Sequence, residues 1–188
     1  SGVIPDNVKE SKEFISNIDK WCLWIRDEDL SEALEISEIA KRIKKVEKMR
    51  LSSSDKSAHK LAERPHQFRE INETKTNSIA IPLTTSERRE YIPIGFVDSN
   101  TVLTNALSVI YEAEAWIFGV ISSRMHMAWV RAIGGKLKTD YRYSAKICYN
   151  TFPFPEISKV KKANIEENVF AVLEEREKHP EKPMAELY

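Results

Sequence analysis

The sequence lacks the motifs by which many enzymes are recognised. Its five glycines form no glycine-rich phosphate loop, and its two cysteines and four histidines form no cluster with metal-ligand spacing. The carboxylates do not gather around a lysine in a metal-binding arrangement, which disfavours an independent nuclease. We therefore expect no catalytic residue, no cofactor site and no metal site in this chain.

Long apolar runs and targeting signals are also lacking. No stretch of about twenty apolar residues occurs, and no signal-peptide pattern is present. Cys22 and Cys148 each lie in a short apolar run, which is typical of buried thiols in a reducing compartment and not of a disulfide framework. These features predict a cytoplasmic protein that contacts no membrane.

The net charge is zero, but the charges are unevenly distributed. Residues 1–40 carry ten acidic and four basic side chains, whereas residues 41–69 carry three acidic and ten basic ones. A second basic stretch, residues 121–150, has six basic side chains and a single acidic one, Asp140. Two basic stretches favour a surface that meets a polyanion, although ordinary variation of surface charge explains the pattern equally well.

Hydrophobic periodicity predicts a mixed α+β fold with a small antiparallel-rich sheet, a long central helix and a C-terminal helical appendage. Helices are expected over residues 10–20, 31–50, 56–62, 105–133 and 162–178, and strands over 21–25, 78–83, 90–97 and 147–149. The helix at 105–133 is the longest, and Gly134-Gly135 is expected to end it as a left-handed C-cap.

Basic residues follow this long predicted helix and its glycine pair. Arg124 and Arg131 are seven residues apart, which places them on one helix face. Lysine and arginine side chains neutralise phosphates, and an arginine can form two hydrogen bonds with a guanine. Hydroxyl groups nearby could add hydrogen bonds to phosphates or base edges. The further candidates here are Lys136, Lys138, Tyr141, Arg142, Tyr143 and Ser144. A solvated loop after a core helix is an equal alternative.

Two other places could contact DNA. Lys44, Lys45 and Lys48 precede Arg50 and Ser52, which together would form a phosphate-positioning surface. Arg88 and Arg89 occupy the tip of a predicted hairpin that could enter a groove. A solvated helix face and a simple polar turn are the corresponding alternatives.

A protein-interaction module is the rival from another class. The large side chains that would anchor a partner are Trp21, Trp24, Trp116, Trp129, Met125 and Met127. Their spacing fits core packing better than an exposed anchor surface.

Several segments resemble one known family in order and in detail. They include WCLW at 21–24, FGVISSRMHMAW at 118–129, GKLKTDYRYS at 135–144 and YNTFPFP at 149–155. Over residues 15–156 the chain is similar to the target-recognition region of MmeI-like enzymes. These are bacterial Type II restriction-modification enzymes and related DNA adenine-N6 methyltransferases that act within one polypeptide.

The resemblance implies a division of labour. Residues 1–156 would form a domain that recognises a sequence in double-stranded DNA, and residues 157–188 would begin a truncated C-terminal helical segment. The methyltransferase domain of the same parent chain would bind S-adenosylmethionine, and the fragment alone would be inactive. Whether the parent also cleaves DNA is left open.

Specific roles follow from the resemblance. It implicates Lys136 and Lys138 in base recognition, with Arg124, Arg131 and Arg142 as backbone anchors. Lys136 stands where an arginine is expected after the glycine pair. A lysine reads guanine less selectively than the planar guanidinium of arginine.

Overall fold

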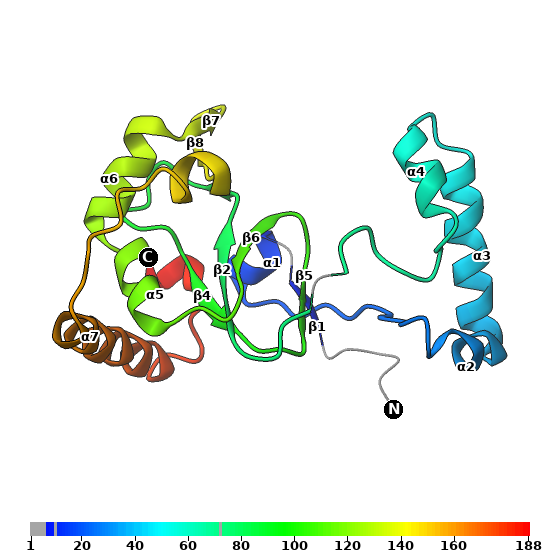
Figure 1. The fold of residues 1–188 in the computed structure, drawn as a ribbon, viewed down its shortest axis with the longest axis horizontal. Coiled ribbons are helices and arrows are strands. Elements are labelled where there is room, and N and C mark those ends of the chain that lie inside the picture. Colours follow the sequence, from blue (N-terminus) through cyan, green and yellow to red (C-terminus); the bar gives the residue numbers. More distant parts are fainter. Residues whose placement is uncertain (1–6, 10, 72) are drawn as a thin grey trace. The chain divides into compact units, whose positions relative to one another are not determined.

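The structure is a computed structural model that describes residues 7–9, 11–71 and 73–188 (Figure 1). The chain divides into two compact units. Unit 1 comprises Ser1–Val8 and Trp21–Glu73, and unit 2 comprises Lys9–Lys20 and Thr74–Tyr188. The short strand β1 (Asn7–Lys9) lies where the sequence passes from one unit to the other.

Unit 1 is built from three helices joined by ordered loops. They are α2 (Leu30–Glu35), α3 (Ser37–Leu51) and α4 (Lys56–Leu61). Ile39 and Ile43 of α3 are four residues apart and pack with Ile25 and Ala33 in a small core. The Asp55 carboxylate caps α4 by accepting a hydrogen bond of 2.8 Å from the Ser57 backbone amide.

Unit 2 contains two three-stranded antiparallel sheets. The first has the order β4-β2-β6, with the fully buried strand β2 (Ser78–Pro82) between β4 (Gly95–Val97) and β6 (Leu107–Ile110). The second has the order β3-β8-β7 and is formed by β3 (Thr84–Thr85), β8 (Asp140–Arg142) and β7 (Gly135–Leu137). Strand β5 (Thr101–Leu103) precedes β6 in the sequence.

Helices cover the core of unit 2. They are α1 (Ser11–Ser16), α5 (Ala115–Ile121), α6 (Arg124–Ile133), α7 (Lys159–Glu177) and α8 (Met184–Leu187), with a π-helical turn at Ala145–Tyr149. The buried core includes Ile79, Phe118 and Val130. Helices α5 and α7 approach closely at Gly119, where a Cβ atom would lie 2.5 Å from a methyl group of Ile165. Only a glycine therefore fits this crossing without a shift of α7.

The α+β class with small antiparallel sheets is confirmed, but several expected elements differ. The helix expected at 105–133 is wrong, because its first part forms β6 and Ser122-Ser123 separates α5 from α6. The Ser122 hydroxyl donates to the Phe118 carbonyl at 2.7 Å and ends α5, while the Ser123 hydroxyl caps α6 by accepting from the His126 amide. Gly134 has an extended backbone (φ −66°, ψ 149°) in place of the expected left-handed cap.

Three further differences are local. The helix expected at 31–50 is interrupted at Ile36, whose extended backbone (φ −83°, ψ 106°) separates α2 from α3. Residues 21–25 form no strand, and the strand expected at 147–149 is the π-helical turn. The domain boundary at residue 156 stays a prediction, and α7, which follows it, packs against α5 within unit 2.

The described residues form no disulfide, no membrane-spanning helix and no metal-binding cluster. Cys148 is buried and Cys22 is half-buried, and both are free thiols. Among the described residues, no helix is both long and apolar enough to cross a lipid bilayer. The same residues include no group of three His, Cys, Asp or Glu side chains that could hold a metal ion.

Candidate nucleic-acid interface

A cationic hairpin formed by β7 and β8 is the main candidate site in unit 2 (Figure 1). Leu137 pairs with Asp140, so Lys138 and Thr139 form a two-residue turn. Lys138 has φ 58°, a left-handed backbone conformation that residues other than glycine adopt at a cost in conformational energy. Lys136 and Lys138 are both exposed. The hairpin therefore presents two ammonium groups to solvent on a hydrogen-bonded scaffold.

The aromatic ring of Tyr141 holds the base of this hairpin to α6. Lys136 Nζ lies 5.5 Å from the ring centroid, and the Arg131 guanidinium carbon lies 6.0 Å from it. Both distances are typical of cation–π contacts. Arg131 also donates a hydrogen bond of 3.3 Å to the Arg89 carbonyl. Tyr141 thus brings two of the predicted DNA-contact residues, Arg131 and Lys136, to one place.

Arg124 lies at the opposite end of α6 from Arg131, so the two do not converge. It donates hydrogen bonds to Tyr91 Oη at 2.9 Å and to Glu90 Oε1 at 2.7 Å. The Tyr91 hydrogen bond and then the Glu90 charge raise the pKa of its guanidinium. The pair is exposed on both sides, so it contributes little to stability and can be exchanged for a phosphate contact.

Residues after the hairpin divide between surface and core. Arg142 is exposed on β8, and no described residue accepts a hydrogen bond from its guanidinium. The Ser144 amide donates to Cys148 Sγ at 3.5 Å and begins the π-helical turn. Tyr143 is only 2 % exposed, and its hydroxyl lies 3.1 Å from His126 Nε2. The DNA contact predicted for Tyr143 is therefore corrected, since this side chain belongs to the core.

The turn that follows β3 also separates two predicted arginines. Arg88 is exposed, and its backbone amide donates to Ser86 Oγ at 3.3 Å. Arg89 donates instead to the carbonyls of Ala185 and Tyr188 at 3.0 and 2.8 Å. Arg88 keeps a free guanidinium among the described residues. For Arg89 the prediction is corrected, because its guanidinium anchors the C-terminal segment.

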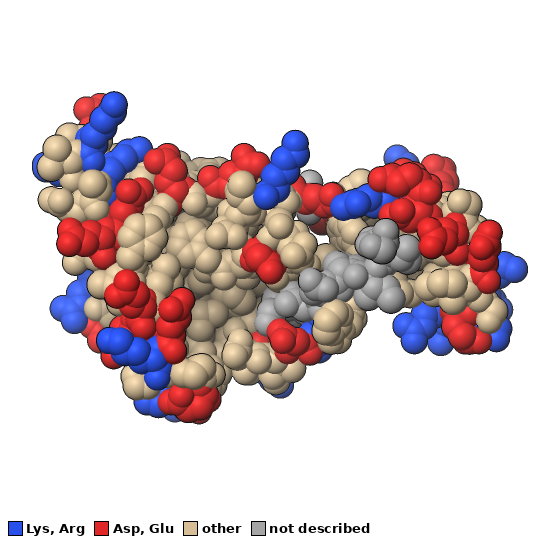
Figure 2. Space-filling view, turned by 90° about the horizontal axis from the view of Figure 1, so that it is seen from below, with Lys and Arg blue, Asp and Glu red and all other residues tan. Residues whose placement is uncertain are grey.

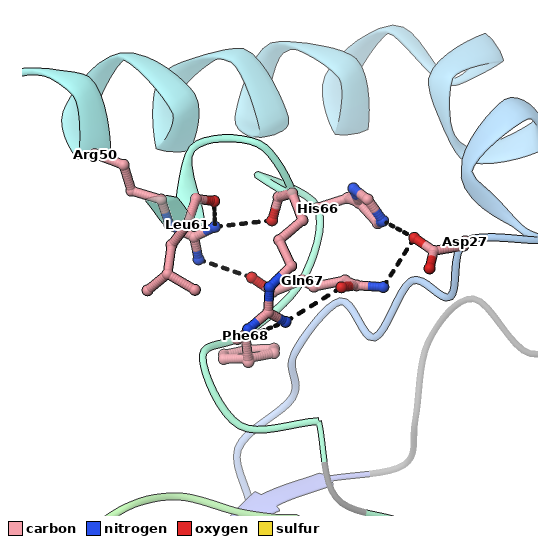
Figure 3. Close-up of polar contacts among 7 residues, drawn as sticks. Asp27, Arg50, Leu61, His66, Gln67 and Phe68 are labelled. Atoms are coloured by element: carbon pink, nitrogen blue, oxygen red, sulfur yellow. Dashed lines mark hydrogen bonds and ion pairs between the residues drawn. The ribbon is translucent and has the colours of Figure 1, made fainter. Parts of the chain in front are cut away.

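In unit 1, Arg50 holds the chain together instead of facing solvent (Figure 3). Its guanidinium donates to the carbonyls of Leu61, Arg64 and Gln67 at 2.7, 2.9 and 2.7 Å. Burial, followed by the charges of nearby arginines, lowers the pKa of Arg50. The DNA contact predicted for Arg50 is thus corrected to a structural role, since all three acceptors are backbone carbonyls, one at the end of α4 and two after it.

Ser52 also has a local role. Its hydroxyl donates to the Met49 carbonyl at 3.0 Å, which satisfies an acceptor in the last turn of α3. The side chain is exposed, so the prediction of a phosphate contact at Ser52 stays open.

The exposed face of α3 carries the cations that Arg50 does not supply. Lys41, Lys44, Lys45 and Lys48 follow a three-to-four-residue spacing on the side opposite Ile39 and Ile43. Lys41 pairs with Glu38 at 2.8 Å, whereas the other three have no ion-pair partner among the described residues. This lysine face is a second candidate phosphate-binding surface.

Side-chain hydrogen bonds of Asp27 and Glu73 connect the loops of unit 1, and the sequence did not predict them. One Asp27 carboxylate oxygen lies 2.9 Å from His66 Nε2 and 3.0 Å from the Gln67 side-chain amide (Figure 3). Glu73 accepts hydrogen bonds from Trp24 and Arg26, which lower the pKa of its carboxyl. These partners are 39 to 49 residues apart, so no local pattern could have revealed them.

Comparison with known proteins decides what these two surfaces belong to. A family model described as the MmeI target recognition domain matches residues 6–156. The chain belongs to this family. It is 42% identical to DNA methyltransferase A of Bacillus subtilis over an alignment of 190 positions, which covers 98% of the chain and 22% of that protein.

A solved structure gives the same result for the fold of this target-recognition domain. The restriction-modification enzyme MmeI in complex with DNA matches with a TM-score of 0.94 and 42% identity, over 99% of this chain and 25% of that one. The chain therefore spans about a quarter of the length of these relatives.

The anchors of the rival interaction-module hypothesis are mostly packed within the target-recognition domain. Trp24 stacks on Phe68 with ring centroids 5.7 Å apart, Trp129 packs edge-on against Phe152, and Met127 is buried. Trp116 lies beneath the Lys162 ammonium at 4.3 Å. Trp21 and Met125 are the exceptions, with 68 % and 73 % of their surface exposed. Trp21 belongs to unit 1 and Met125 to unit 2.

Proposed function

We propose that this chain recognises a short sequence in double-stranded DNA for an adenine-N6 methyltransferase of a bacterial restriction-modification system. The observation that carries the proposal is the β7–β8 hairpin, whose exposed lysines are mounted on a sheet in a domain of the MmeI target-recognition family. A two-stranded ribbon of this kind fits the major groove, where each base pair presents a distinct pattern of donors and acceptors.

In this proposal base reading and phosphate binding are separate tasks. The ammonium groups of Lys136 and Lys138 donate hydrogen bonds to base edges, with guanine O6 and N7 as the best acceptors. Arg131, Arg142 and the exposed Arg124 bind phosphates and fix the register of the hairpin on the duplex. Phosphate contacts release counterions, so we expect affinity to fall steeply as salt is added.

The lysine face of α3 would add phosphate contacts without reading bases. Its ammonium groups are point charges on flexible stems, which can follow the phosphate backbone. On the face of unit 2 that Figure 2 shows, acidic side chains lie beside basic ones around an uncharged area. A face of mixed sign attracts a polyanion weakly, so we do not place the DNA contact on this face.

The chemistry of methylation would belong to a methyltransferase domain on the same longer polypeptide. That domain would bind S-adenosylmethionine, which supplies the methyl group. The residues of this chain would bind the duplex and position the adenine, and they would neither bind the cofactor nor transfer the methyl group. Membrane attachment is not part of the proposal.

Methylome sequencing of cells that express the full-length parent tests the proposal. We expect Lys136→Ala and Lys138→Ala each to relax or change one position of the methylated sequence. The matched control is Lys161→Ala, which removes an exposed lysine from α7 and should leave the sequence unchanged. An unaltered methylated sequence in both hairpin variants would rule out base reading by these lysines.

A further inference from the structure

An apolar groove on unit 2 takes no part in the proposed DNA contact. It has a volume of about 640 Å³ and lies between α5, α6, α7 and the segment that follows the π-helical turn. The side chains that define it are Met125, Ala128, Trp129, Phe152, Pro155 and Ile165. None of the described residues that line the groove is a lysine or an arginine, so the groove offers no cation to a phosphate backbone.

The exposure of Met125 shows that the groove is incomplete. This side chain is 73 % exposed, whereas Met127 on the same helix is 2 % exposed and lies in the core. A methionine is a flexible apolar side chain that adapts to a docked surface. An apolar groove of this kind is the type of surface that receives an apolar partner.

We propose that this groove docks an apolar helix face from the rest of the longer polypeptide in which the chain works. The inference rests on the proposed function, because that function assigns the methyltransferase domain to the same polypeptide. The relatives support this occupant, since the chain corresponds to only 22% and 25% of their lengths. About three quarters of each relative therefore lies outside the matched part and must pack somewhere.

The position of the groove in the sequence favours a partner within the same polypeptide. The family match ends at residue 156, and the groove walls come from both sides of that point, with Phe152 and Pro155 before it and Ile165 after it. A tethered partner has a high effective concentration. An open groove with modest intrinsic affinity is therefore sufficient, and insertion of an amphipathic helix is a common way to fill one.

Methionine oxidation of the full-length parent, mapped by peptide mass spectrometry, tests this docking. Met125 and Met49 are both exposed in the chain, while Met127 is buried and serves as the protected reference. If the groove is occupied, Met125 should oxidise at least ~10-fold more slowly than a free methionine peptide added as standard, because buried thioethers react slowly. The experiment is run without DNA and at two protein concentrations.

The outcomes separate the possible occupants. Protection of Met125 that is independent of concentration supports docking within one polypeptide. Oxidation at the rate of the free peptide overturns the proposal. Protection that grows with protein concentration assigns the groove to a second copy, and protection that requires DNA assigns it to DNA, and both results overturn it as well.

A variant gives an independent readout in the same protein. Met125→Glu places a charge in the groove, so it should lower the melting temperature of the full-length parent and expose its domain junctions to limited proteolysis. Met49→Glu is the matched control at another exposed methionine and should change neither. If only the DNA-reading proposal fails, Met125 stays protected while the methylated sequence is unaltered in the Lys136 and Lys138 variants. If only the docking proposal fails, Met125 oxidises at the rate of the free peptide while the methylated sequence changes in those variants.

Discussion

Lowering the pH from 7 to 5 is expected to destabilise unit 2 through a single buried histidine. His126 has no exposed surface, its Nε2 atom lies 3.1 Å from the Tyr143 hydroxyl, and its ring packs edge-on against Phe152. Burial lowers the pKa of His126 from its ordinary value of 6.5 to about 4. The imidazole therefore stays neutral in the folded state at a pH where it is protonated in the unfolded chain.

The sign and size of the effect follow from proton linkage. Between pH 6.5 and about 4 the unfolded state binds one more proton than the folded state, so stability is lost as the pH falls and levels off below about 4. One pKa unit corresponds to about 1.4 kcal/mol, so the loss between pH 7 and pH 5 is about 2 kcal/mol. This loss is a large share of the stability of a typical domain.

Urea unfolding at pH 7, 6 and 5 measures this loss against a non-titrating reference. The variant His126→Gln keeps a side chain that can pair with Tyr143, and it should show a shallower decline of the unfolding free energy with pH. The other histidines and the carboxylates are the same in both proteins, so their contributions cancel in the difference. Equal pH dependence in the two proteins would refute the assignment of a buried, neutral His126.

Three other substitutions test separate contacts. Arg50→Met should destabilise unit 1 by about 2–3 kcal/mol in thermal unfolding because three carbonyls lose their donor, whereas Lys48→Met on the exposed face should change stability by less than about 0.5 kcal/mol. Gly119→Ala should cost about 1–3 kcal/mol through overpacking against α7, while Gly135→Ala, where a Cβ would lie 3.9 Å from the Arg142 Cβ in ordinary van der Waals contact, should be nearly neutral. Tyr141→Leu should weaken DNA binding about three-fold through loss of the cation–π contacts, and Tyr141→Phe should preserve binding in a fluorescence-anisotropy titration. A comparable loss in Tyr141→Phe would indicate a direct contact of the hydroxyl with DNA.

Local sequence patterns predicted the parts of the fold that depend on local interactions. The apolar run at 78–83 became β2 and the segment at 56–62 became α4, since propensity and capping act within a few residues. The prediction of one helix over 105–133 was wrong, because a local apolar stretch fits both a strand and a buried helix. Pairing with β2 decides for β6 there, and no residue within the segment reveals that pairing.

The candidate site shows a different limit. The sequence identified the cations of the hairpin, but it could not separate exposed arginines from those that bind the protein itself. Arg88 and Arg89 are neighbours, yet only Arg89 reaches carbonyls 96 and 99 residues away. Arg50 likewise differs from Lys48 because backbone carbonyls at the end of α4 and just after it accept its hydrogen bonds. Such roles depend on hydrogen-bond acceptors that the tertiary structure brings close, and the pattern of charges along the sequence does not reveal them.

Under the proposed function, the position of the two hairpin lysines would let such a domain change its recognised sequence without losing its fold. Lys136 and Lys138 are exposed, and the hairpin beneath them is held by backbone pairing and by Tyr141. Their side chains contribute almost nothing to the core, in contrast to Tyr143, which is buried two residues beyond Tyr141. Substitutions at the two lysines therefore act on the DNA contact with little cost in stability. Under that proposal base reading varies on a scaffold that stays the same, because the proposed readers lie on β7 and in the turn, while the buried Tyr143 lies just after β8.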